Sequence, residues 1–179
     1  MAFTTAEFRR TMANFATGVT VVTTVLEDRF YGLTVNAFCS VSLDPALLLV
    51  SIDKNSRTHP ILLQSHIFAV NMLTAKQQYL SERFARKDVN EYRSFADIKL
   101  HTGETGAPLF DESMAHLECR VVAEYEGGDH TLFLGQVLNV HHNGELDAQG
   151  QEVLPLLFYR SRYCSTQLQQ RLSQSDGIR

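Results

Sequence analysis

The sequence lacks the features that define several large protein classes. It has three cysteines in 179 residues, and no C-x-x-C pair, so we expect neither a disulfide framework nor a zinc knuckle. Lys and Arg number 16 against 20 Asp and Glu, which leaves no excess positive charge for nucleic acid. No apolar run approaches a membrane span, and Glu7, Arg9 and Arg10 interrupt the N-terminus where a signal peptide needs an apolar segment. We therefore expect a cytoplasmic protein with no nucleic-acid partner and no membrane contact.

Motifs for common nucleotide-binding and hydrolytic sites are also missing. There is no G-x-G-x-x-G, no G-x-x-x-x-G-K-[ST], no G-x-S-x-G and no H-E-x-x-H. Adjacent His141 and His142 do not suggest a metal site, because neighbouring residues on a strand point to opposite faces. We predict no metal centre, and any nucleotide site must form without a Rossmann unit or a P-loop.

What is present is the composition of an ordinary globular domain. Hydrophobic residues make up 44% of the chain and charged residues 20%, a balance that can support one buried core. No linker or internal repeat divides the sequence. We predict one domain over residues 1–166, followed by a polar tail over residues 167–179.

The apolar periodicity predicts mostly strands. A hairpin is expected over residues 19–26 and 30–35, and two long strands over residues 115–125 and 130–142, with a last strand at 155–159. The continuous apolar runs 46–52 and 67–73 predict strands buried on both faces. Helices are expected over residues 4–16, where Thr4 and Glu7 have capping-box spacing, over 56–65 and over 75–86. Residues 87–94 predict a mobile loop. The fold class is therefore mainly β, a β-barrel with a few flanking helices.

Two stretches combine residue types that could bind a ligand. In residues 32–45, Thr34, Asn36, Ser40 and Ser42 interrupt an apolar segment with small hydrogen-bonding groups, which suits a planar ring rich in heteroatoms. A strand with one face in water would give the same pattern. In residues 51–60, hydroxyls and Arg57 precede a short helix and could hold a phosphate, although an ordinary capped turn is the simpler interpretation.

A third candidate is His130, which follows Gly128 and Asp129 at the start of an apolar strand. A single histidine at this position is more often a turn residue with a satisfied hydrogen bond than a catalytic group. The basic residues Arg83, Arg86 and Lys87 near the end of the third predicted helix also allow a simple explanation, because positive charge is favourable at a helix C-terminus.

Seven blocks in order resemble one protein family. They are FRRTMANFATGVTVVTT, GLTVNAFCSVSLDP, LLLVSI, FAVNML, LSERFA, GDHTLFLGQV and PLLFYRSRY. They resemble the flavin reductases that supply reduced flavin to two-component monooxygenases, of the phenol and 4-hydroxyphenylacetate hydroxylase type. The resemblance implies a split β-barrel homodimer that transfers a hydride from NADH or NADPH to FMN or FAD for a partner monooxygenase.

The resemblance also implies roles for particular residues. The isoalloxazine ring of the flavin would lie against Thr34, Asn36, Ala37, Ser40, Val41 and Ser42. The flavin phosphate would be held by Ser51, Ser56, Arg57 and Thr58, with Phe84, Ala85 and Arg86 lying over flavin and phosphate. Gly128, Asp129 and His130 match the family's Gly-Asp-His motif, where His130 would position the nicotinamide, and Arg162 and Tyr163 would contact a nucleotide edge. One departure is Cys164, since family members commonly have histidine after this tyrosine.

Other functions remain open on the sequence. The same barrel could serve as a non-catalytic flavin carrier, although such a protein has no need of the Gly-Asp-His block. It could reduce another acceptor, such as a ferric chelate or a corrinoid, through the bound reduced flavin. A barrel that binds a different small ligand and no flavin is a third alternative. The choice between FMN and FAD and between NADH and NADPH is not determined by the residue types.

Overall fold

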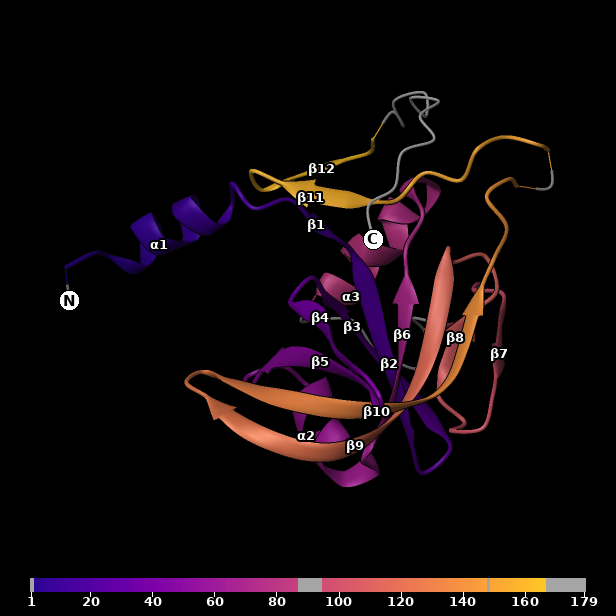
Figure 1. Ribbon diagram of the computed structural model, residues 1–179, viewed down its shortest axis with the longest axis horizontal. Helices are drawn as coiled ribbons and strands as arrows, with labels where there is room; N and C mark the ends of the chain where they lie inside the picture. The colour runs from indigo at the N-terminus through magenta and orange to yellow at the C-terminus, as the bar shows by residue number, and fades with distance from the viewer. Residues whose placement is uncertain (1, 87–94, 148, 167–179) are drawn as a thin grey trace.

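The computed structural model describes residues 2–86, 95–147 and 149–166. Its centre is a seven-stranded antiparallel sheet, curved into a barrel, with the strand order β3-β2-β6-β9-β10-β5-β4 (Figure 1). The strands are β2 (Thr20–Leu26), β3 (Arg29–Val35), β4 (Phe38–Leu43), β5 (Ala46–Asp53), β6 (Ile67–Met72), β9 (Ala115–Gly127) and β10 (His130–His142). The mainly β, split-barrel fold expected from the sequence is confirmed.

The barrel has a seam between its two edge strands. The edges of the sheet are β3 and β4, which follow each other in the chain and are joined by Asn36 and Ala37. No hydrogen-bonded ladder between β3 and β4 is present among the described residues, and the backbone of Ala37 accepts a hydrogen bond from Ser51 N of β5 at 3.0 Å. The sheet therefore opens at this point, where the ends of three strands meet.

Apolar side chains fill both sides of the central strands. Val22 belongs to a core inside the barrel that also contains Phe68 and Phe133, each fully buried. Val21 points to the other side of β2, into a second core with Phe84 and other residues outside the sheet. Burial on both faces explains why β2 reads as a nearly continuous β-branched run, with no polar face for water.

Of the helices in the described residues, the second and third pack against the barrel and the first does not. They are α1 (Thr5–Met12), α2 (Thr58–Ser65) and α3 (Gln78–Ala85), the last preceded by a 3-10 turn, η1 (Ala75–Gln77). The predicted capping box is confirmed, because Glu7 N donates to Thr4 Oγ1 at 3.2 Å and Thr4 N to the Glu7 carboxylate at 2.8 Å. α1 is shorter than predicted. It ends at Met12, and the backbone N–H of the C-cap residue Ala13 donates to Arg9 O. α1 projects away from the barrel (Figure 1), and none of its residues is buried.

Several short strands were not predicted from the sequence. β1 (Thr17–Gly18) and β12 (Arg162–Cys164), neither of them predicted, form a small sheet with β11 (Leu157–Tyr159), which lies within the strand predicted at 155–159. β7 (Leu100–Thr102) pairs with β8 (Pro108–Phe110), and neither was predicted. These segments are two or three residues long, too short for a periodicity to be visible. The prediction that residues 46–52 are buried on both faces was wrong, because buried and half-buried residues alternate along β5. The predicted loop at 87–94 and the tail at 167–179 lie outside the described residues.

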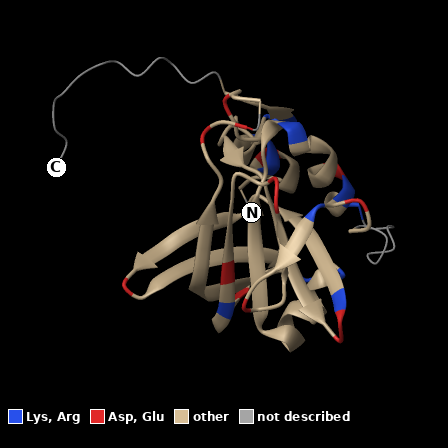
Figure 2. Cartoon of the chain, turned by 90° about the vertical axis from the view of Figure 1, so that its right-hand side faces the viewer, with Lys and Arg blue, Asp and Glu red and all other residues tan. Residues whose placement is uncertain are grey.

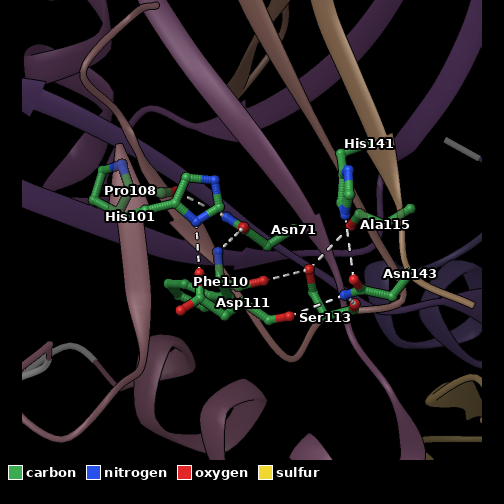
Figure 3. A network of polar contacts seen from close by, with 9 residues as sticks. All are labelled: Asn71, His101, Pro108, Phe110, Asp111, Ser113, Ala115, His141 and Asn143. Atoms are coloured by element: carbon green, nitrogen blue, oxygen red, sulfur yellow. Dashed lines mark hydrogen bonds and ion pairs between the residues drawn. The ribbon is translucent and has the colours of Figure 1, made fainter. Parts of the chain in front are cut away.

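A polar network attaches β8 and the residues after it to the main sheet (Figure 3). Asn71 of β6 is fully buried; its Oδ1 accepts from Phe110 N at 2.7 Å and its Nδ2 donates to Pro108 O at 3.3 Å. Asn143 donates to the backbone carbonyls of Asp111 and Ser113 at 2.9 and 2.5 Å. Asn71 therefore satisfies backbone groups of β8, and Asn143 satisfies backbone carbonyls of the residues that follow β8.

Candidate functional site

A cleft of about 320 Å³ lies at the seam of the barrel. It is formed by the end of β3, the end of β5, the segment before and at the start of α2, the end of α3, and the first residue of β10. The predicted site residues that line it are Thr34, Asn36, Ala37, Ser51, Ser56, Arg57, Thr58, Phe84, Ala85, Arg86 and His130. Residues from five separate segments of the sequence thus come together in one cleft.

One wall of the cleft depends on a close approach between β3 and α3. Gly32 is buried, and a Cβ added to it would lie 2.7 Å from Cε1 of Phe84 and 2.8 Å from its Cδ1. No side chain fits at such a distance, so glycine is required for the Phe84 ring to lie against β3. Phe84 is held from behind by Phe95 and Phe110, with ring centroids 5.0 and 5.9 Å away. Packed aromatic rings therefore support this wall.

Another part of the cleft lining is the turn between β5 and α2. Asp53 accepts hydrogen bonds from Asn55 N and Nδ2 at 2.8 and 3.1 Å, and Ser56 N donates to the Asp53 backbone carbonyl at 2.9 Å. The Ser56 hydroxyl accepts from His59 N at 3.2 Å. These local bonds fold the segment into a tight turn that presents Ser56 and Arg57 to the cleft. A hydroxyl and a guanidinium beside a helix start are suited to an anion.

Two threonines of the site are already engaged with the protein. Thr34 Oγ1 donates to Ser81 O of α3 at 2.6 Å, and Thr58 Oγ1 donates to Gly32 O of β3 at 3.3 Å. Each hydroxyl has a single proton, so in this arrangement neither donates to a ligand. Their role in the structure is to tie α3 and α2 to β3, which fixes the width of the cleft.

His130 lies at the mouth of the cleft, at the first position of β10. Its Nδ1 is 2.7 Å from Asp129 Oδ1, and the hydrogen bond to His130 lowers the pKa of the Asp129 carboxyl below its ordinary value. An ionised carboxylate can only accept, so Nδ1 donates in this bond and Nε2 is the ring nitrogen that remains for a ligand. The imidazole side chain is 38% exposed, which leaves it accessible to a ligand in the cleft.

The remaining predicted residues lie outside the lining of the cleft. Ser40, Val41 and Ser42 are on β4, where a bulge between Ser40 and Ser42 interrupts pairing with β5. Gly128 and Asp129 form the turn that carries His130, and Arg162 and Tyr163 are on β12. The Tyr163 hydroxyl is 2.9 Å from Ser81 Oγ of α3, so this tyrosine contacts the helix behind the cleft.

Five further residues line the cleft and were not predicted: Gly32, Leu33, Val35, Asp53 and Asn55. A glycine inside a strand is a recognised sign of close backbone approach, so Gly32 could have been found from the sequence. The others are ordinary strand and turn residues, and only the folded arrangement places them at the site.

Charge is distributed over the surface with both signs mixed in the view of Figure 2. Of the basic residues near the end of α3, Arg83 bonds Asp97 at 2.5 and 2.8 Å, and this raises the pKa of the guanidinium. Arg86 lines the cleft. Among the described residues, no helix is long and apolar enough to cross a membrane, and no group of three or more His, Cys, Asp or Glu could hold a metal ion.

Comparison with known proteins identifies the family. The family described as "Flavin reductase like domain" matches residues 12–167. The chain belongs to the flavin reductase family. It is 42% identical over 135 residues to the FMN reductase (NADH) SmoA of Agrobacterium fabrum, covering 75% of each chain. It is also 36% identical over 156 residues to HsaB of Mycobacterium tuberculosis, a reductase subunit of a flavin-dependent monooxygenase, covering 87% of this chain and 79% of HsaB.

A solved flavin reductase structure has the same fold. The NADH:FAD oxidoreductase SgcE6 of Streptomyces globisporus, solved in complex with NAD and FAD fragments, aligns with a TM-score of 0.77 at 35% identity. The alignment covers 96% of this chain and 94% of SgcE6.

The cleft of this flavin reductase fits a flavin on its own geometry. Gly32 makes room for the Phe84 ring against β3, and this largely buried ring contributes to the lining of the cleft. Asn36 brings both a donor and an acceptor, and Ser56 with Arg57 supplies donors for a phosphate. An apolar wall with few polar groups suits the ring, and a separate cationic end suits the phosphate.

Proposed function

We propose that this protein is an NADH:flavin oxidoreductase that reduces FMN or FAD and supplies the reduced flavin to a partner monooxygenase. The observation that carries the proposal is the cleft at the barrel seam, whose lining combines residues from the segments predicted to bind the ring, the phosphate and the nicotinamide. The relatives SmoA and HsaB, named as an NADH-dependent FMN reductase and a monooxygenase reductase subunit, support the same activity.

In this proposal the protein binds and orients, and the cofactor supplies the redox chemistry. When bound, the flavin would supply the hydride-accepting chemistry, with the nicotinamide nucleotide as the donor. Asn36, the backbone of Ala37 and Ser51 would hold the ring edge, and Ser56 and Arg57 would hold the phosphate. Phe84, Ala85 and Arg86 form the side of the cleft that covers flavin and phosphate. Keeping the reactants together at a fixed distance and away from water is the main contribution to rate.

His130 is proposed to position the nicotinamide. Its Nδ1 is occupied by Asp129, which fixes the ring and leaves Nε2 to contact the nicotinamide amide. We expect His130→Ala to raise the KM for NADH about tenfold, on the order of one lost hydrogen bond, with flavin affinity unchanged. Gln at this position retains an amide oxygen that can accept a hydrogen bond and is expected to recover part of the loss.

Ser40, Val41, Ser42, Arg162 and Tyr163 keep more distant roles in the proposal. β4 is the edge of the seam beside the cleft, and β12 contacts α3 through Tyr163. We propose that these residues support the flavin and nucleotide sites from outside the described cleft.

We also propose that the protein is a homodimer. α1 exposes Phe8 and Met12 by 53% and 49%, and the following Phe15 is 69% exposed. An eight-residue helix is too short to be stable alone, and an exposed apolar stripe of this kind is typical of an interface. Light scattering is expected to give roughly twice the chain mass of 20.2 kDa; a monomer would refute the proposal.

We further propose that the flavin reductase domain ends at residue 166 and that the protein is cytoplasmic, as expected from the sequence.

The deciding experiment is NADH oxidation by the purified protein, followed by nicotinamide absorbance with and without FMN or FAD. Flavin-dependent turnover is the expected result, and repeating it with NADPH ranks the hydride donors. Tight flavin binding with no oxidation of either nucleotide would refute the reductase function. A flavin carrier would then be the better description.

A further inference from the structure

The turn that carries His130 is a two-residue connection between the long strands β9 and β10. Gly127 pairs with His130 across it, and Gly128, the first turn residue, has φ +75°, a conformation that glycine adopts without strain. The turn lies at the end of a long hairpin (Figure 1). The position of His130 relative to the cleft therefore depends on what holds this hairpin tip against β5 and α2.

Lys54 makes three contacts with the tip. Its backbone N–H donates to Asp129 O at 3.0 Å, directly after the last ladder pair of β5 and β10, Asp53 with His130. Its ammonium donates to Gly128 O at 2.8 Å and to the Glu126 carboxylate at 2.5 Å. The Lys54 side chain thus links Glu126 of β9 to Gly128 of the turn.

The three contacts differ in weight. Glu126 is 85% exposed and the Lys54 side chain 34% exposed, so water competes strongly for the carboxylate side of the pair. The hydrogen bond and the ion pair with Lys54 lower the pKa of Glu126, so this carboxylate is ionised at neutral pH. The bond to the Gly128 carbonyl acts on the backbone of the turn, and its loss changes the turn itself.

A second attachment comes from α2. His59 Nε2 is 2.8 Å from the hydroxyl of Thr131, a buried residue, and the His59 ring packs edge-on against Phe133 at 5.8 Å between centroids. Lys54 and His59 flank the segment that lines the cleft with Asn55 to Thr58. The segment expected to bind the flavin phosphate is therefore the same one that holds the hairpin tip.

We propose that Lys54 is a positioning residue for flavin reduction, which fixes the Gly128–His130 turn against the phosphate-binding segment so that His130 faces the cleft. The proposal rests on the proposed function. Lys54 is not among the residues that line the cleft, so it acts through the turn and leaves flavin binding to the other residues. His59 supports the same turn from the other side.

The principal variant is Lys54→Met, which keeps the length of the side chain and removes the ammonium. We expect the KM for NADH to rise about five- to tenfold, with the dissociation constant of the flavin, measured by fluorescence quenching, within twofold of wild type. Lys54→Arg keeps the donors and is expected to recover most of the loss. Lys76→Met is the matched control, because Lys76 bonds Asp147 outside the cleft and should leave both constants unchanged.

A double-mutant cycle separates positioning from direct contact. If Lys54 acts through His130, Lys54→Met combined with His130→Ala loses no more than His130→Ala alone. If Lys54 itself bound the nucleotide, the two losses would add, and the proposal would be overturned. Glu126→Gln is expected to have a small effect, because the turn keeps its bond from Lys54 to Gly128. If Glu126→Gln raised the KM for NADH as much as Lys54→Met does, the bond from Lys54 to the Gly128 carbonyl would not be the contact that positions the turn, and the proposal would be overturned.

A readout without cofactor tests the geometry independently of activity. In protein free of flavin, the imidazole proton resonances of His130, assigned by their loss in His130→Ala, are expected to shift in Lys54→Met and to return in Lys54→Arg. Unchanged resonances together with unchanged KM would refute the inference while leaving the reductase function intact. A wild type that oxidises no NADH with any flavin would refute the proposed function, and the inference with it.

Discussion

Glu118 is the buried carboxylate on which the loop after β7 depends. It lies on β9, is 1% exposed, and its Oε1 accepts from Thr105 N and Thr105 Oγ1, both at 2.8 Å. Oε2 is 3.5 Å from Asn139 Nδ2. A Cβ at residue 103 would overlap the carboxylate, so Gly103 is needed for the loop to pass over it. We predict that Glu118→Gln destabilises the fold in a pH-dependent way.

The magnitude follows from the two short bonds. Hydrogen bonds to a charged group contribute about 1.5–3 kcal/mol each, roughly twice a neutral bond. An amide oxygen can still accept from Thr105, so the variant loses the charged part of each bond, about 1–2 kcal/mol in all after the lower desolvation cost of a neutral group is subtracted. For a chain of this size that corresponds to a fall in Tm of about 2–8 °C.

The pH dependence has a definite sign. Burial alone would raise the pKa of Glu118, but hydrogen bonds from Thr105, Glu104 and Asn139 outweigh it and lower the pKa below its ordinary value of 4.5. A lowered folded-state pKa stabilises the protein above the unfolded value, and this stabilisation is lost as pH falls through the folded-state pKa. The Tm difference between wild type and Glu118→Gln should therefore be full at neutral pH and shrink below pH 4.5.

The assay is thermal unfolding by circular dichroism at several pH values, with Glu112→Gln as control. Glu112 bonds Lys99 on the surface, and its side chain is 61% exposed, so its substitution should change stability by less than about 0.5 kcal/mol. Equal Tm values for wild type and Glu118→Gln at neutral pH, or a difference that grows on acidification, would refute the reasoning.

Two further predictions concern the cleft wall and the thiols. Gly32→Ala forces the Phe84 ring to move, because the new Cβ lies 2.7 Å from it. We expect the free energy of unfolding to fall by about 1–3 kcal/mol and flavin binding, measured by fluorescence titration, to weaken about tenfold. Unchanged affinity and Tm would contradict the close approach. Cys119 is buried, and burial raises its pKa to about 12, whereas Cys39 and Cys164 are exposed. A thiol reagent should modify Cys39 and Cys164 in the native protein and Cys119 only after unfolding. Rapid reaction of all three thiols in the native protein would contradict the burial of Cys119.

The sequence predicted the long elements because their signals are local. The alternation along residues 130–142 gave β10 with the same bounds, and Thr4 with Glu7 gave the start of α1 within one residue. Phe8 and Met12, in contrast, form an apolar stripe on α1 that is exposed in the single chain. Local periodicity gives a helix its apolar side but not what that side contacts.

The site divides in the same way. Residue types in 51–60 and the Gly-Asp-His block indicated chemistry, and the family resemblance assigned the roles. Only the fold brought Ser56, Phe84 and His130 around one cleft. The cleft lies where β3 and β4 do not pair with each other, and the strand order that separates them depends on contacts between residues far apart in the chain.

The sequence by itself predicted the long strands, the family and the kinds of residue proposed to bind a flavin, since each depends on short-range pattern or on ordered motifs. The tertiary structure alone decided that the Thr34 and Thr58 hydroxyls bond the backbone, and that Lys54 holds the turn of His130. Hydrogen bonds between distant segments have no signature in the sequence. They exist only once the hydrophobic core has set the strands in register.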